Sequence, residues 1–186
     1  MIDNSIIEEI DRIIKETWVN DIAKDYHSAY LLKEASLKCS IYFHLRTKLG
    51  KILDENNLRI YPEYYFHNLS YYADIAIVQV DNSTDKARDK VVDVIAVMDL
   101  KYDCRNYIGT ANSIKYDLHK IKNCIQLGKL CQYYFVVIYE TECICLNWLD
   151  KRNTNNWAKG YVTELNAGGM NGCIVFEVNS YNGMNT

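Results

Sequence analysis

The sequence predicts an α/β fold in which a central mixed β-sheet is flanked by helices. Three observations predict it: helix-type apolar spacing before residue 55, three strand-like segments between residues 58 and 101, and a helical stripe followed by further strands. The expected order is helix, helix, three strands, helix, two strands, a long loop and a last strand. A chain of 186 residues with this order suits one domain.

Two helices are expected before the first strand. The first runs from Ser5 to about Trp18, and its apolar face is formed by Ile6, Ile10, Ile13 and Ile14. The second covers about residues 27–54, with an apolar stripe that includes Leu31, Ala35, Leu45, Leu49, Ile52 and Leu53. Glu34 falls within this second helix and interrupts its apolar stripe, so we expect the carboxylate to meet a partner inside the protein.

Strand-like patterns begin after Asn56-Asn57. The expected strands are 58–66, 71–80 and 91–101, with a polar loop over 81–90 between the last two. The third strand is almost continuously apolar up to Met98, which is typical of a central strand covered on both faces.

The second half of the chain begins with a helix. It is capped by Asn112 or Ser113 and runs to about Leu127. Strands are expected at 132–139, 144–149 and 173–178, and the polar, Asn-rich residues 150–172 are expected to form a long loop. The single domain, residues 1–186, would then comprise a helical extension (1–26), a core (27–140) and C-terminal strands with a loop (141–186).

Composition and charge exclude several classes of protein. Hydrophobic residues make up 49% and charged residues 24%, which is ordinary for a globular chain. The net charge of -3 excludes a generally basic coat. Two segments are nevertheless basic: residues 31–60 carry 6 basic and 3 acidic side chains, and residues 101–130 carry 6 and 2. We expect these segments to face phosphates if the partner is nucleic acid.

No secretory signal or membrane-spanning run is visible in the sequence. Acidic residues interrupt the first thirty positions, and no apolar run approaches the roughly 18 residues that a membrane span needs. The seven cysteines show no paired metal-binding spacing. We therefore expect a cytoplasmic location, reduced cysteines and no membrane partner.

Charged residues end the third predicted strand. Asp99 and Lys101 alternate on one face of it, directly after the apolar run. Asp74 begins the preceding strand. If the two strands form an antiparallel hairpin with Val80 opposite Asp93, then Asp74 lies opposite Asp99 on the same face. A slip of one residue would break this alignment.

Two carboxylates that lie so close repel each other unless a cation or a proton lies between them. Oxygen ligands of this kind suit Mg²⁺ or Mn²⁺. Glu34 would provide a third acid at the metal. The alternative is a buried salt-bridge network without metal, although three acids for one lysine is a poor balance of charge.

These residues resemble the PD-(D/E)xK nuclease superfamily, which has the restriction-endonuclease-like fold. The resemblance covers about residues 27–140 and rests on Glu34, Asp74 and Asp99-Leu100-Lys101 in an α-β-β-β-α-β order. Ala73 stands where the family commonly has proline, and Asp99 where glutamate is commoner. The resemblance implies a Mg²⁺-dependent phosphodiesterase with Asp74, Asp99 and Glu34 at the metal, Lys101 as the catalytic lysine, and a homodimer as a plausible assembly.

Further residues are expected near this site. Glu63 lies on the strand before Asp74 and is either a neighbour of the metal or a solvated acid. Asp117 lies on the helix that, in the resemblance, borders the site. The same helix carries Lys115, Lys120 and Lys122, which form either a phosphate-binding face or a solvated helix face.

Two functional hypotheses follow. The first is a metal-dependent nuclease that hydrolyses phosphodiester bonds of nucleic acid, with DNA as the expected substrate. The second is a catalytically inactive nucleic-acid-binding or protein-interaction module that keeps the nuclease fold. Metal binding by the three acids would distinguish the two hypotheses.

Overall fold

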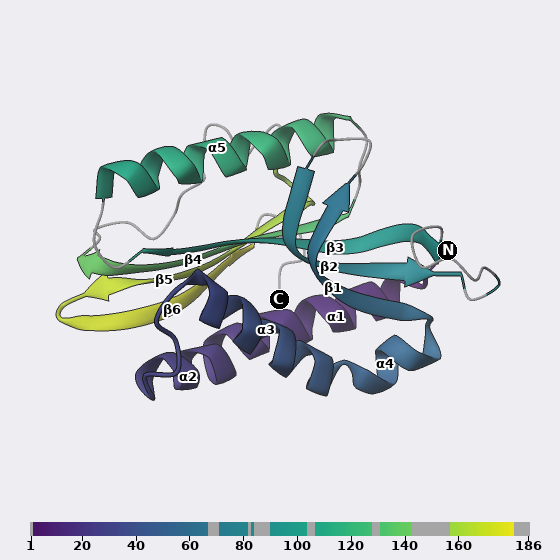
Figure 1. The fold of residues 1–186 in the computed structure, drawn as a ribbon, viewed down its shortest axis with the longest axis horizontal. Coiled ribbons are helices and arrows are strands. Elements are labelled where there is room, and N and C mark those ends of the chain that lie inside the picture. The colour runs from purple at the N-terminus through teal and green to yellow at the C-terminus, as the bar shows by residue number, and fades with distance from the viewer. Residues whose placement is uncertain are drawn as a thin grey trace.

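A six-stranded mixed sheet lies between two helical layers (Figure 1). The computed structural model describes residues 2–66, 71–81, 83, 90–103, 107–127, 131–142 and 157–180, with the backbone alone at 103, 107–114 and 141–142. The strand order is β1-β2-β3-β4-β5-β6. Helices α1 to α4 cover one face of this sheet, and helix α5 covers the other. The α/β class with a mixed sheet and flanking helices is therefore confirmed.

The N-terminal helical segment is longer than the sequence predicts. Helix α1 (Asn4–Glu16) continues without a break into a π-helical segment, η1 (Thr17–Ile22), and then into α2 (Ala23–His27). The carboxylate of Asp3 accepts a hydrogen bond from the backbone N–H of Ser5 at 2.8 Å and caps the first turn. This helical segment ends near Ala29, whose φ of 58° lies in the left-handed region.

The single helix predicted over 27–54 is wrong. The structure has α3 (Glu34–Lys48) and α4 (Gly50–Glu55), separated from α2 by residues 28–33. The Ser36 hydroxyl accepts hydrogen bonds from the backbone N–H groups of Leu32 and Lys33, which fixes the start of α3. Glu34 is consequently in the first turn of a helix rather than in its middle.

The first three strands match the prediction closely. They are β1 (Leu58–Phe66), β2 (Tyr71–Val80) and β3 (Val91–Asp103), and neighbours are antiparallel. Ile75 pairs with Met98 in the register that the sequence analysis assumed for Asp74 and Asp99. The expected pair Val80–Asp93 is wrong: two irregularities in the ladder place Val80 opposite Val91.

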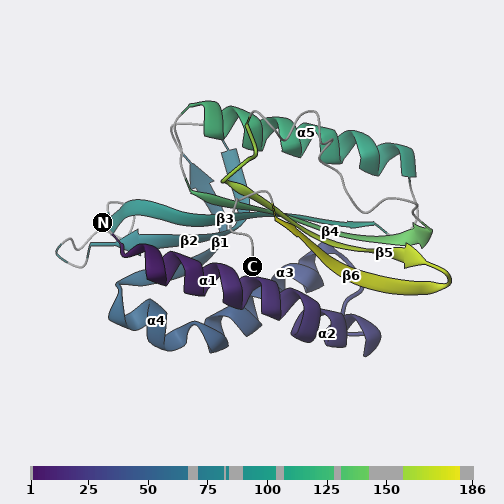
Figure 2. The ribbon, with the colours of Figure 1, turned by 180° about the vertical axis from the view of Figure 1, so that it is seen from behind.

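The C-terminal half differs most from the prediction. Helix α5 (Tyr107–Gln126) begins before Asn112, and β4 (Gln132–Glu142) runs parallel to β3. The loop expected over 150–172 is wrong in part, because Val162–Met170 forms β5, parallel to β4. Strand β6 (Cys173–Ser180) returns antiparallel to β5, as Figure 2 shows from behind. The strand expected over 144–149 lies outside the described residues.

Each face of the sheet has its own apolar core. The core under α1, η1, α3 and α4 includes Ile14, Trp18, Leu37, Leu45, Met98, Leu100 and Leu165. The core under α5 includes Val97, Ile121, Cys124, Phe135 and Val137. Residues 1–26, expected as an extension, thus contribute fully buried side chains to the larger core. Among the described helices, none combines the length and apolar character that a membrane crossing requires.

Candidate functional site

The predicted site lies at a fork in the sheet, where β1 and β2 bend away from β3. Glu63 has a φ of 52°, a conformation that non-glycine residues rarely adopt. Beyond this position the ends of β1 and β2 rise toward α5 (Figure 1). The β2–β3 ladder ends at the pair Ile75–Met98. The fork therefore opens immediately beside Asp74 and Asp99.

Asp74 is held by a backbone donor and by a lysine. The backbone N–H of Leu100 donates to its Oδ2 at 2.8 Å, and Lys38 Nζ lies 2.6 Å from its Oδ1. Lys38 comes from α3 and also contacts Glu63, so one ammonium joins a helix to both strands of the hairpin. Glu63 is exposed and partnered by this lysine.

Asp99 is almost fully buried, with 4% of its surface exposed. The Tyr71 hydroxyl donates a hydrogen bond to its Oδ2. Burial raises the pKa of Asp99 to about 7; the tyrosine hydrogen bond opposes this rise, and the charges of Asp117 and Asp74 reinforce it. Near neutral pH the side chain is therefore divided between its charged and its neutral form.

Lys101 lies among three acids. Its Nζ is 2.9 Å from Asp117 Oδ2 on α5 and 3.9 Å from Glu34 Oε2 on α3. Burial by itself would lower the pKa of Lys101, but the hydrogen bond and charge of Asp117, with the charges of Glu34 and Asp74, outweigh burial and raise it. Lys101 is therefore a stable cation between the two helical layers.

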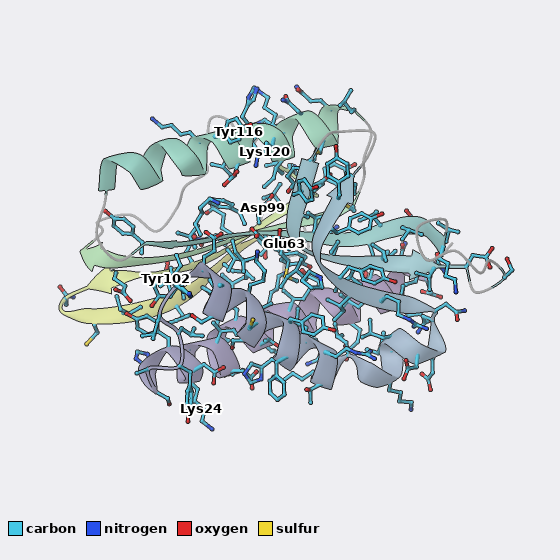
Figure 3. All side chains as sticks on the ribbon, viewed as in Figure 1. Lys24, Glu63, Asp99, Tyr102, Tyr116 and Lys120 are labelled. Atoms are coloured by element: carbon cyan, nitrogen blue, oxygen red, sulfur yellow. The ribbon has the colours of Figure 1, made fainter. Side chains whose placement is uncertain are left out.

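Asp117 is the second buried carboxylate of the site. Its two oxygens each contact one lysine, Lys101 at 2.9 Å and Lys120 at 2.9 Å. Burial raises the pKa of Glu34, and Lys101 opposes that shift while Asp74 and Asp117 add to it. The structure thus gathers Glu34, Asp74, Asp99 and Lys101 at the fork, together with the accessory residues Glu63 and Asp117. Figure 3 shows Glu63 and Asp99 between α3 and α5.

The carboxylates do not yet form a metal cage. Within the described parts of the chain, no three His, Cys, Asp or Glu side chains converge as ligands for one ion. Lysine ammonium groups instead contact Asp74, Glu34 and Asp117. The donor chemistry nevertheless fits a hard divalent cation: burial chiefly raises the pKa of Asp99, and the negative charges of Asp117 and Asp74 add to that rise.

Sequence reasoning missed Lys38 and Tyr71. Lys38 follows Glu34 by one helical turn, so the i, i+4 rule could have placed both side chains on one face of the helix. Tyr71 lies three residues before Asp74, and nothing in its local pattern distinguishes it from the other tyrosines. Among the expected phosphate-binding lysines of α5, Lys115 is exposed, Lys122 is half-buried, and Lys120 pairs with Asp117; their contact with phosphates stays a prediction.

Strand β5 adds a third buried carboxylate to this face of the sheet. Asp99 pairs in register with Phe135, which pairs with Glu164 on β5. Glu164 is fully buried and accepts a hydrogen bond from the side-chain amide of Asn166 at 3.3 Å. It lies about 10 Å across the sheet from Asp99, at two strand spacings. The prediction of a loop over these residues hid this carboxylate.

Comparisons with protein families, with curated proteins and with solved structures find no match for this chain.

Proposed function

We propose that the protein is a Mg²⁺- or Mn²⁺-dependent nuclease of the PD-(D/E)xK type, built on a restriction-endonuclease-like core, with DNA as the expected substrate. One observation carries the proposal: Glu34, Asp74, Asp99 and Lys101 come from three separate elements and meet at one fork. Support also comes from the order of the elements: apart from the short helix α4 between α3 and β1, the elements α3, β1, β2, β3, α5 and β4 follow the α-β-β-β-α-β pattern of that superfamily.

Asp74 and Asp99 would hold the cation, with Glu34 as an additional ligand. The cation would polarise the scissile phosphate and lower the pKa of a bound water. Near pH 7 Asp99 is protonated in a fraction of the molecules, so cation binding would release protons to solvent. The excess negative charge around Asp99 favours a cation over an empty site.

Lys101 acts as a charge rather than as a base. Its pKa is raised, so it holds its proton at neutral pH and cannot take one from water. A fixed ammonium at this position would stabilise negative charge that develops on the phosphate. Asp117 is a positioning residue, because it contacts both Lys101 and Lys120 from beneath α5.

A non-cutting binding module is the second candidate. The observation that favours it is the ion pair between Lys38 and Asp74, which satisfies a proposed metal ligand with a cation of the protein itself. A module of this kind would keep the fork as a structural network and would need no divalent cation.

Cleavage of supercoiled plasmid and of circular single-stranded DNA tests the proposal. Wild type should cut at least one of them with Mg²⁺ or Mn²⁺ and neither in EDTA, while Lys101→Ala should lose activity by about 100-fold or more. Lys24→Ala is the matched control, since Lys24 is exposed on α2 and far from Asp99 in Figure 3.

Two results would overturn the proposal. One is equal cleavage by wild type and Lys101→Ala. The other is a folded wild type that cuts neither substrate with either cation. Thermal melts of each variant establish that a loss of cleavage is not a loss of fold.

A further inference from the structure

Two exposed tyrosines lie close along the chain to acids of the fork. Tyr72 is 60% exposed and lies two residues before Asp74 on β2, so the two side chains share a face of the strand. Tyr116 is 65% exposed and directly precedes Asp117 on α5. Large aromatic side chains usually bury most of their surface. Two exposed rings near one cluster of charged residues therefore indicate a surface that binds a ligand.

Neighbouring groups hold both rings. The Tyr65 ring lies across the hairpin from Tyr72, with 4.4 Å between ring centroids. Lys120 Nζ lies 4.8 Å from the Tyr116 ring centroid and 5.5 Å from that of Tyr71. These contacts restrain both rings before any ligand arrives, which lowers the entropy lost on binding.

The charge around Tyr116 suits an anionic chain. In the part of α5 whose side chains are described, Lys115 is exposed and Lys120 and Lys122 are half-buried. The single acid there, Asp117, is buried and neutralised by lysines. Tyr116 and Lys120 lie above Asp99 in Figure 3, so this basic helix face borders the fork.

We propose that Tyr72 and Tyr116 stack on unpaired bases on either side of the phosphate at the fork, so that the site takes single-stranded nucleic acid. An aromatic ring can stack only on a base whose face is open, and a duplex hides those faces within its own stack. Lysines along α5 would contact the phosphates between the stacked bases. This inference rests on the proposed function, because it names the substrate class of the same site.

Binding in EDTA tests the inference apart from cleavage. Fluorescence anisotropy would compare labelled oligothymidylate, an abasic strand of equal length and a duplex of equal length. Wild type should prefer oligothymidylate to the other two. Tyr72→Ala and Tyr116→Ala should each weaken oligothymidylate binding by about fivefold or more and leave abasic-strand binding unchanged.

Two variants serve as controls. Tyr72→Trp keeps a stacking ring and should bind oligothymidylate like wild type. Phe43→Ala removes an aromatic ring that is 63% exposed on α3, next to His44 and its partner Asp25, and it should change nothing. Equal affinity of wild type for the oligothymidylate and abasic strands, tighter binding of the duplex, or unchanged affinity in both alanine variants of the fork would overturn the inference.

The two proposals can fail separately. Cleavage that needs metal and Lys101, together with unchanged binding by Tyr72→Ala and Tyr116→Ala, overturns base stacking alone. Ring-dependent binding of oligothymidylate without any cleavage overturns the nuclease alone and leaves a single-strand-binding module.

Discussion

Lysine side chains neutralise most of the acids at the fork, and each does so from a different element. Lys38 on α3 contacts Asp74, Lys101 on β3 contacts Asp117 and Glu34, and Lys120 contacts Asp117. A carboxylate removed from water is costly unless it is paired, so these contacts stabilise the fold when no ion is bound. Asp99 has a neutral tyrosine hydroxyl in this role, and its pKa is the one that rises to about 7.

The pKa of Asp99 predicts a pH-dependent stability. The folded chain holds a proton on Asp99 up to about pH 7, whereas an unfolded chain releases it near pH 4. Stability should therefore fall as pH rises between these values, and Asp99→Asn should remove that fall. Between about pH 4 and about pH 8, the free energy of unfolding of the variant should rise relative to that of wild type by up to roughly 4 kcal/mol.

Urea unfolding in EDTA at several pH values would measure this gain. Asp93→Asn, at an exposed aspartate on the same strand, is the control and should follow wild type. A constant difference between Asp99→Asn and wild type across the pH range would show that Asp99 does not titrate as described.

Replacing Lys38 should have opposite effects on two properties: it should lower the stability of the protein and tighten its binding of Mn²⁺. Lys38→Met removes the ammonium 2.6 Å from Asp74 Oδ1 and should cost about 1 kcal/mol of stability. The same change should tighten Mn²⁺ binding about fivefold, because the cation no longer competes with the lysine. Calorimetric titration with Mn²⁺ would measure the affinity of wild type and of the variant. Lys48→Met is the control: it breaks the ion pair between Lys48, at the end of α3, and Asp21 on η1, and it should leave Mn²⁺ affinity unchanged. Weaker Mn²⁺ binding by Lys38→Met would contradict the prediction.

At the scale of elements, the β5–β6 hairpin depends on its turn. Asn171 and Gly172 connect the paired residues Met170 and Cys173, and both have positive φ, 53° and 78°. Asn-Gly is the preferred sequence for such a two-residue turn, because its twist matches that of the flanking strands. The hairpin is thus encoded locally even though its first strand is not.

Gly172→Ala should destabilise the protein by about 1 kcal/mol, since alanine disfavours the left-handed conformation. Gly50→Ala is the matched control. Gly50 begins α4, has no positive φ, and an added Cβ there meets nothing within 4 Å. We expect that control to be neutral or to stabilise by up to about 1 kcal/mol. Denaturant midpoints would decide, and equal effects of the two substitutions would refute the explanation by turn geometry.

Across the whole molecule, Trp18 joins the N-terminal helix to the last two strands. Its indole N–H donates to the carbonyl oxygens of Glu177 at 3.1 Å and of Asn166 at 3.3 Å. The ring is 1% exposed and packs against Phe176 with ring centroids 5.0 Å apart. One side chain therefore joins segments that are more than a hundred positions apart in the chain. The segment 1–26 is an integral part of the core.

Trp18→Phe should cost about 2 kcal/mol, because it leaves a cavity and removes a donor from two carbonyls. Val19→Ala, at the adjacent and 39% exposed position, should change stability by less than about 0.5 kcal/mol. Equilibrium unfolding followed by circular dichroism would compare them. A Trp18→Phe variant as stable as wild type would mean that the N-terminal helix is held by other contacts.

Local patterns predicted the elements whose signals are contained within themselves. The bounds of β1 and β2 and the start of β3 followed from apolar runs and flanking polar residues. The register assumed for the β2–β3 hairpin holds at Ile75–Met98, although its assumed anchor, Val80–Asp93, is wrong. Three residues of the candidate site, Asp74, Asp99 and Lys101, could be placed together from the sequence because all three lie on the β2–β3 hairpin. Glu34 lies 3.9 Å from Lys101, but on a helix whose bounds were predicted wrongly, and its role at a metal stays a prediction.

The sequence by itself determined β1, β2 and β3 and the β2–β3 hairpin that carries Asp74, Asp99 and Lys101, because the interactions that specify them are close in the chain. Tertiary structure alone decided that residues 162–170 form a strand, that Lys38 meets Asp74, and that Tyr71 meets Asp99. Strand β5 carries Thr163, Glu164 and Asn166, which appear polar in sequence and become buried only when β4 and β6 pair with it. Such pairings depend on contacts between distant segments, which no local pattern of hydrophobicity or charge records.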